Sequence, residues 1–359
     1  MKHTRRATAA GWARANLFSS WGNAILTVVS VAAIGLLAWQ ALDWVLLRAV
    51  FSGADGSACA KPDAGACWPF ITHKLGLFMY GRYPVPERWR VDLTYVSALA
   101  GLVPLMIPRV PGKLWLSVYL LLAFPIIGFV LVRGGVPGLP GVPTELWGGL
   151  FLTLVVASVG IAASFPIGIF LALGRRSELP IVRWASIGFI EFVRGVPLIT
   201  VLFMSSVMLP LFLPAGVSFD KLVRALVGVA LFAGAYMAET IRGGLQAIPR
   251  GQFEGAMALG LGYWRMMGFV VLPQALRLVI PGIVNSFIAL FKDTTLVLIV
   301  AIFDLLGQLR AAFADPSWAT PVTLFTGFAF AGMIYFLVSF GMSRYALSME
   351  RRLNTEHRR

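Results

Sequence analysis

The sequence has little charge, few histidines and almost no cysteine. Of its 359 residues, 13% are charged and 58% are hydrophobic, whereas an ordinary soluble protein carries about 25% charged residues. It contains three histidines and two cysteines, and none of the histidines falls inside a long hydrophobic run. This composition argues against a soluble globular protein, and the shortage of histidine argues against a membrane-embedded enzyme with a Ser/His or metal centre.

A nucleotide-binding phosphate loop, Gly-x-x-x-x-Gly-Lys-Ser/Thr, is also missing from the sequence. The nearest resemblance is Gly112-Lys113, but leucine follows and the rest of the pattern is lacking. The chain is therefore expected to hold no cofactor of its own and to perform no ATP hydrolysis, so any use of ATP depends on another chain.

Basic residues outnumber acidic ones, and the formal net charge is +14. The basic residues lie between hydrophobic runs instead of along one soluble stretch, as they do in the cytoplasmic loops of membrane proteins. We therefore expect membrane lipid, and no nucleic acid, around this chain.

Long hydrophobic runs are abundant. A run of about 18 or more apolar residues predicts a transmembrane helix. Four runs are clear, three are interrupted by polar groups, and one is shorter and contains Pro104. The clear runs are 24–47, 114–132, 146–173 and 320–340. The interrupted runs are 184–213, 222–241 and 266–291, and the short run is 91–108. The predicted fold is all-α, a polytopic helical membrane protein with about eight transmembrane helices.

The basic residues predict the orientation. Lys2, Arg5, Arg6 and Arg14 precede the first run and favour a cytoplasmic N-terminus. With eight crossings, the basic tail 348–359 is cytoplasmic as well, and the loop 51–90 lies outside.

Cys59 and Cys67 both fall in that loop, where a disulfide or two free thiols are possible. With His73 they lack a fourth ligand, so no metal site is predicted.

A segment rich in glycine and proline, 133–145, separates two parts of the chain. We expect an N-terminal extension, 1–145, with about three transmembrane helices and the loop 51–90. A second part, 146–347, would hold about five helices. Residues 296–306 could add a short helix dipping back into the outer leaflet.

The segment 250–265 is too short to cross a membrane. Only ten residues separate Glu254 from Arg265, and as a helix they would rise about 15 Å, half of a hydrocarbon core. Phe253, Ala256, Met257 and Gly260 recur with helical spacing and predict one apolar stripe. Its small residues favour docking against a protein, although an amphipathic helix resting on lipid is the alternative.

The same segment resembles a known signature. The pattern Glu254-Gly-Ala-(x)3-Gly260-(x)9-Val270-x-Leu272-Pro273 is similar to the Glu-Ala-Ala signature of permease subunits of bacterial ABC importers, with Gly255 in place of the first alanine. The flanking segments 236–252 and 273–277, together with Glu191-Phe-Val-Arg-Gly-Val-Pro197 and Lys292-Asp-Thr-Thr-Leu296, resemble the polar amino-acid branch of that family. The extra N-terminal helices resemble the larger permease of general L-amino-acid systems, or that of a narrower glutamate/glutamine/aspartate/asparagine system.

The resemblance implies a bacterial inner-membrane permease that moves polar or general L-amino acids into the cytoplasm, with 146–347 as its five-helix type I importer core. The segment 250–265 would be the coupling helix that docks on a separate ATPase subunit, which would bind ATP and Mg²⁺. A second homologous permease, forming a heterodimer, and a periplasmic amino-acid-binding protein would complete the importer. The residues implied in coupling are Gly251, Gln252, Glu254, Gly255, Ala256, Gly260, Leu272 and Pro273.

Several polar residues lie within or at the ends of the hydrophobic runs, where charges are costly unless they face partners or a wet cavity. We expect some of them to line the path of a zwitterionic substrate: Glu191, Arg194, Glu239, Asn285, Asp293, Thr294 and Thr295. The alternatives are an internal Glu191–Arg194 ion pair at a break near Pro197 and, for Lys292-Asp293, a place at the membrane interface. An ion-coupled secondary transporter is the competing function for these acids, but the chain shows no internal repeat of the kind such transporters carry.

Overall fold

The computed structural model describes residues 8–107, 110–214, 216–217 and 219–356, and every regular element in that part of the chain is helical. Lys2, Arg5, Arg6, Arg358 and Arg359, which contribute to the predicted orientation, lie outside the described residues. The α-helices are α1 (Ala9–Asn16), α2 (Trp21–Leu42), α3 (Trp68–Tyr80), α4 (Arg88–Met106), α5 (Lys113–Val118), α6 (Phe124–Arg133), α7 (Gly149–Arg175), α8 (Pro180–Gly195), α9 (Leu198–Phe203), α10 (Lys221–Ala247), α11 (Arg250–Ala258), α12 (Tyr263–Met266), α13 (Leu272–Asp293), α14 (Leu305–Ala312) and α15 (Pro321–Glu356).

The chain forms two compact units. The first comprises residues 1–73 and 313–328, and the second comprises 74–312 and 329–359. The predicted N-terminal extension, 1–145, is therefore divided between both units.

In the first unit, a disulfide joins Cys59 to Cys67. The backbone N–H of Cys67 donates to Thr326 Oγ1 at 2.8 Å, and the rings of Phe70 and Trp318 lie 5.9 Å apart. Both sulfurs are fully buried, so this small region is organised around a covalent link and an aromatic contact.

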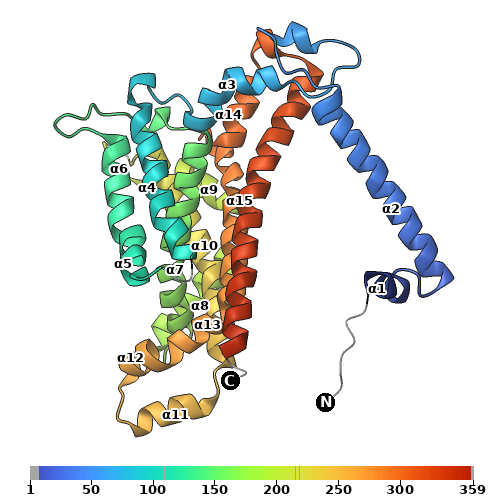
Figure 1. Ribbon diagram of the computed structural model, residues 1–359. Coiled ribbons are helices and arrows are strands. Elements are labelled where there is room, and N and C mark those ends of the chain that lie inside the picture. The colour runs from blue at the N-terminus through green and yellow to red at the C-terminus, as the bar shows by residue number, and fades with distance from the viewer. Residues whose placement is uncertain (1–7, 108–109, 215, 218, 357–359) are drawn as a thin grey trace. The chain divides into compact units, whose positions relative to one another are not determined.

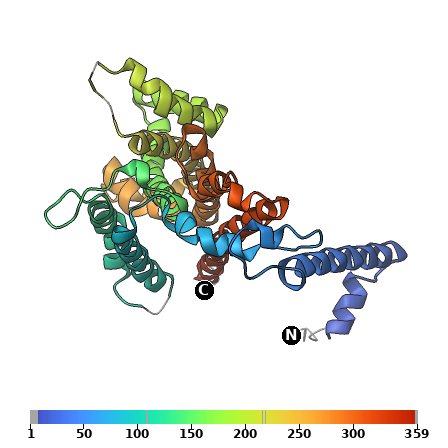
Figure 2. The same cartoon turned by 90° about the horizontal axis from the view of Figure 1, so that it is seen from above.

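The second unit is a bundle in which α7, α10 and α13 lie side by side, with α11 at one end and α14 towards the other (Figure 1). Seen from above, the teal helices α4 to α6 flank these helices (Figure 2). Their packing is apolar: Val91 of α4 and Val132 of α6 share a buried cluster with Phe151 of α7 and Val229 of α10. Helices that precede the Gly/Pro-rich segment 133–145 therefore share one hydrophobic core with helices that follow it.

Within the described residues, five helices are long and apolar enough to cross a membrane, or six if a bent pair is counted as one span. They include Trp21–Leu47, Gly149–Arg175, Lys221–Ala247, Tyr263–Val300 and Pro321–Arg351. The remaining two predicted runs, 91–108 and 114–132, are helical in α4 and in α5 to α6 over the described residues. Arg90 and Asp92 in the first turns of α4 lower its hydropathy. Taken together, these helices are consistent with the predicted all-α fold of about eight spans.

The run 184–213 is not the single straight span that the hydrophobic pattern suggests. It forms α8 and a second helical stretch, Leu198–Phe212, bent by 108° at the break between them. Val196 and Pro197 are both extended there. A proline disfavours helical backbone at the residue before it, which explains the conformation of Val196. The break falls where the sequence places Gly195 and Pro197.

The predicted short helix over 296–306 is also interrupted. A 3-10 helix, Thr294–Val300, continues α13 directly and ends at Ala301, whose φ of 52° is left-handed. The chain then turns into α14. Since only a continuous right-handed backbone makes a helix, this left-handed residue divides the segment in two.

Candidate functional site

Helix α11 is short because its end is closed by a glycine motif. Gly260 has a left-handed φ of 73°, its N–H donates to Met257 O at 2.9 Å, and the N–H of Leu261 donates to Ala256 O at 3.2 Å. These two bonds form the Schellman motif that stops a helix. The helix therefore ends at Ala258, and Gly260 lies in the turn and not on the apolar stripe predicted from its spacing.

One face of α11 packs on its own bundle. Ala256 is buried in a cluster with Met266, Met267 and Val271, and Phe253 lies under the Arg176 guanidinium at 5.5 Å. Gln274 Nε2 donates to Gln252 Oε1 at 3.0 Å, tying α11 to the start of α13. Leu272 and Pro273 form the first turn of that helix, directly after a π-helical turn.

The other face of α11 is open. Gly251, Glu254, Gly255 and Met257 are exposed. Apart from its neighbours in the same helix, a Cβ added at Gly251 or Gly255 would meet no atom of the described part of the chain within 4 Å. Packing within this chain therefore does not require glycine at either position, and the small side chains leave the backbone of this face accessible to another molecule.

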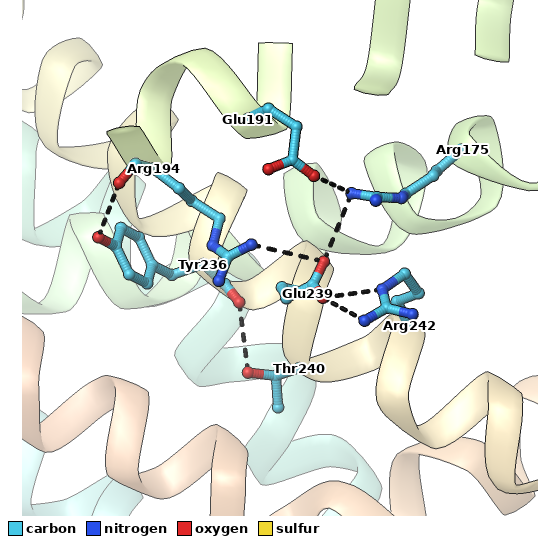
Figure 3. Close-up of polar contacts among 7 residues, drawn as sticks. All are labelled: Arg175, Glu191, Arg194, Tyr236, Glu239, Thr240 and Arg242. Atoms are coloured by element: carbon cyan, nitrogen blue, oxygen red, sulfur yellow. Dashed lines mark hydrogen bonds and ion pairs between the residues drawn. The ribbon is translucent and has the colours of Figure 1, made fainter. Parts of the chain in front are cut away.

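A network of five charged side chains joins α7, α8 and α10 (Figure 3). Arg175 Nη1 lies 2.8 Å from Glu191 Oε1 and 3.6 Å from Glu239 Oε2. Arg194 Nη1 approaches the same Glu239 oxygen at 3.7 Å, and Arg242 Nε donates to Glu239 Oε1 at 2.9 Å. Three arginines face two glutamates, so the network carries one excess positive charge.

This network replaces the Glu191–Arg194 ion pair considered from the sequence. Among the described residues, Glu191 pairs with Arg175 and Arg194 pairs with Glu239. The intrahelical i,i+3 pair is instead Glu239–Arg242. The reason lies in the tertiary structure. Helices α7 and α10 bring Arg175 and Glu239 within reach of Glu191 and Arg194, respectively.

A cavity of about 360 Å³ lies at mid-span between α7, α10 and α13; we call it the mid-span cavity. Its polar lining residues are Ser164, Tyr236, Asn285, Ser286 and Asp293. Asn285 is exposed and Asp293 is half-buried. Pockets of about 300–1,000 Å³ commonly hold small molecules, so this cavity is large enough for one.

Tyr236 connects the cavity with the network. Its ring lines the cavity, its hydroxyl donates to Arg194 O at 3.5 Å, and the Arg194 guanidinium lies 5.6 Å from the ring centroid.

The predicted pathway residues thus fall into three groups. Asn285 and Asp293 line the mid-span cavity, whereas Glu191, Arg194 and Glu239 belong to the charge network. The Thr294 and Thr295 hydroxyls donate to Phe291 O and Lys292 O, at 2.8 and 3.0 Å. Both therefore form hydrogen bonds with backbone carbonyls of the preceding turn.

Sequence reasoning did not identify Arg175, Ser164 or Tyr236 as site residues. Arg175 reads as a charge at the end of a span, and the hydroxyls of Ser164 and Tyr236 fall in otherwise apolar runs. No spacing signal in the sequence links them to the others. In the part of the chain that the structure describes, no group of three or more His, Cys, Asp or Glu side chains could hold a metal ion.

Comparison with known proteins identifies the family. Residues 164–355, which include the whole charge network, every residue lining the mid-span cavity and α11, match the family model described as "binding-protein-dependent transport system inner membrane component". The chain belongs to this family. It is therefore a multi-pass inner-membrane transport component of an ABC importer, which works with ATPase and substrate-binding partners and carries no ATPase site itself.

Relatives match this permease over almost its whole length. The inner membrane amino-acid ABC transporter permease protein YhdY of Escherichia coli K12 is 52% identical, over 96% of this chain and 93% of its own. The glutamate/glutamine/aspartate/asparagine transport system permease protein BztC of Rhodobacter capsulatus is 39% identical, over 97% and 94%. A crystal structure of an amino acid ABC transporter with histidines has a TM-score of 0.50 and 28% identity, covering 57% of this permease and 92% of that chain.

Proposed function

We propose that this permease moves polar L-amino acids into the cytoplasm, with a separate ATPase subunit docked on α11. ATP and Mg²⁺ would be bound by that subunit. Two features of α11 support the docking. The helix is too short to span the membrane, and its open face presents Glu254 to solvent beside Gly251 and Gly255, which have no internal packing role. Glu254 would pair with a basic group of the ATPase.

The mid-span cavity supports an amino-acid path. A zwitterionic substrate needs an acceptor for its ammonium group and donors for its carboxylate. Asp293 can accept from the ammonium group, and the Asn285 amide and the nearby Arg194 can donate. The excess positive charge of the network would favour a carboxylate over a cation at this end of the path.

Assembly follows from the exposed part of the cavity. Asn285 lines the cavity yet is exposed on the surface of this chain, so a second, homologous permease would enclose the path from the other side. We expect a heterodimer of two different permeases, a periplasmic amino-acid-binding protein, and cytoplasmic N- and C-termini.

A substrate panel separates the two candidate ranges. The broader candidate is a general L-amino-acid importer; the narrower one carries glutamate, glutamine, aspartate and asparagine, as the name of one relative states. Competition of labelled glutamate uptake by basic and apolar amino acids would be measured in the assembled complex. Competition by both classes supports the general system, and competition by the four named amino acids alone supports the narrower one.

The coupling role is tested by Glu254→Lys in the reconstituted complex. We expect ATP-driven uptake to be lost while the variant still assembles in the membrane. Glu178→Lys, a change of the same kind at an exposed loop carboxylate, is the control. Full uptake by Glu254→Lys, or wild-type uptake that persists without ATP, would contradict the proposal.

A further inference from the structure

A second cavity lies at the end of the bundle away from α11. It has a volume of about 210 Å³ and is formed by the segment before α7, the first turn of α10, the turn around Ala301 and α14. We call it the end cavity. Helix α11 begins shortly after the last residue of α10, whereas Lys221, the first residue of α10, lines the end cavity. Helix α10 is 27 residues long. At 1.5 Å per residue the two features are about 40 Å apart.

The end cavity carries charged groups that lack ionic partners. Arg82, Glu145 and Lys221 all line it. Arg82 lies over the Phe303 ring at 5.9 Å, and Lys221 Nζ donates to Ala301 O at 3.3 Å. Among the described residues none of the three forms a salt bridge, and Glu145 also accepts no hydrogen bond. Arg82 and Glu145 are exposed and Lys221 is half-buried, so two cations and one anion line the cavity without pairing with one another.

A buried donor in the same lining also lacks a partner. Trp147 is 4% exposed, and its indole Nε1–H makes no hydrogen bond. Most buried polar groups in proteins are paired, so an unpaired one calls for an explanation. Trp147 lines the cavity together with the buried Gln308, and a bound acceptor group would supply its missing partner.

The backbone around the cavity is held in an unusual state. Ala301 is the one described non-glycine residue with a positive φ, and the Lys221 ammonium group bonds to its carbonyl oxygen. Such conformations are concentrated at ligand sites because the surrounding structure must maintain them.

We infer that the end cavity is a binding site for a free α-amino acid, distinct from the mid-span cavity. Arg82, Lys221 and the Trp147 N–H would donate to its carboxylate, and Glu145 would accept from its ammonium group. The volume is below the roughly 300–1,000 Å³ of pockets for drug-sized ligands, which suits a molecule of this size. The inference rests on the proposed function: an amino acid released at this end would be held here before it enters the path.

The test is equilibrium dialysis of radiolabelled L-glutamate against the full-length permease in lipid nanodiscs. We expect Arg82→Gln/Lys221→Gln to lose one equivalent of bound glutamate per chain relative to wild type. Trp147→Phe keeps an aromatic ring and removes the N–H, so the Kd of that equivalent should rise about tenfold. Lys61→Gln, at an exposed lysine that forms no ion pair with any described residue, is the control. Unchanged stoichiometry and Kd in the double variant would overturn the inference.

Glutarate, which lacks the ammonium group, provides a second readout that a misfolded variant would not reproduce. Glu145→Gln should weaken glutamate at this site and leave glutarate equally bound or more tightly bound. Equal weakening of both ligands would overturn the role of Glu145 in the inferred site. If the pocket variants lose only attachment of the periplasmic binding protein and keep glutamate, the cavity receives a protein side chain and the inference is wrong.

Uptake by the reconstituted wild-type complex distinguishes a failure of the proposed transport function from a failure of the end-cavity site. No ATP-driven amino-acid uptake would mean that the proposed function itself fails. Normal uptake combined with undiminished glutamate binding in Arg82→Gln/Lys221→Gln would mean that only the end-cavity site fails.

Discussion

Arg194 and Glu239 form an ion pair, with Arg194 Nη1 3.7 Å from Glu239 Oε2, and this pair links the end of α8 to α10. Neither helix supplies the contact alone. The same glutamate oxygen lies 3.6 Å from Arg175 of α7 but receives no direct hydrogen bond. Glu239 is thus the common acidic partner of three arginines from three helices.

Removal of this common partner should destabilise the bundle. We expect Glu239→Gln to lower the free energy of unfolding by about 1–2 kcal/mol, because three arginines lose a charged acceptor. The effect is at the lower end of the range for charged hydrogen bonds because the Glu239 side chain is 22% exposed. Thermal unfolding of the solubilised chain measures it, and uptake by the complex should fall in parallel. Glu178→Gln is the control; equal stability of both variants would contradict the role of the network.

The open face of α11 predicts a defect in coupling without a defect in folding. Apart from its neighbours in the same helix, a Cβ at position 255 would meet no atom of the described residues within 4 Å, so Gly255→Leu should not lower the thermal stability of the isolated chain. Uptake and association with the ATPase should fall at least tenfold, because the added side chain separates the two backbones. Gly188→Leu on α8, where space is equally open, is the matched control. Unimpaired ATPase association in Gly255→Leu would show that this face is not the docking surface.

The turn after α11 predicts a different result for Gly260. Alanine there should cost about 1–2 kcal/mol, since a Cβ is unfavourable in the left-handed conformation that Gly260 adopts. Amide hydrogen exchange in α11 measures this cost as faster exchange at Leu259 to Leu261. Gly260→Asn should be milder because asparagine tolerates that conformation. Gly255→Ala, within the helix, should be neutral or stabilising; similar exchange in both alanine variants would exclude the Schellman motif as the cause.

Asp304, which precedes α14, predicts a pH dependence of stability. Burial raises the pKa of its carboxyl from 3.8 to about 6, although Gly307 N and the Tyr335 hydroxyl donate to it at 2.8 and 3.1 Å. The folded state therefore binds the proton more tightly than the unfolded state does. The contribution of Asp304 to stability falls as pH rises from about 4 to about 6, by about 3 kcal/mol in total, and is constant above.

Asp304→Asn should remove that slope. Unfolding free energies of wild type and variant, compared at pH 4 and pH 7, should favour the variant more at pH 7. Asp63→Asn, at an exposed aspartate, controls for general effects of charge. A difference between wild type and Asp304→Asn that is the same at both pH values would contradict the raised pKa.

Much of the fold could be predicted from the sequence. The long runs became α2, α7, α10, α13 and α15 because some 20 apolar residues can satisfy their backbone in lipid only as a helix. The start of α11 at Arg250, after Pro249, and the break at Pro197 were predictable for equally local reasons. Gly260, by contrast, matched the spacing of an apolar stripe, while its local conformation made it the end of the helix.

The candidate site was only partly accessible from the sequence. Glu191, Arg194, Glu239, Asn285 and Asp293 were predicted as pathway residues because ionisable or polar groups are costly in an apolar run. Their partners were not, since Arg175 and Tyr236 gave no local signal, and the end cavity joins segments far apart in the chain.

The sequence by itself determined that the long apolar runs of this permease are helical, where α11 begins and which polar groups lie among apolar ones, because these depend on neighbours along the chain. Only the tertiary structure decided that Glu239 takes Arg194 and Arg175 as partners, that Asn285 and Asp293 share one cavity, and that Arg82, Glu145 and Lys221 face another. The physical reason is that charge pairing and cavity shape depend on distances across helices, and those distances are set by packing.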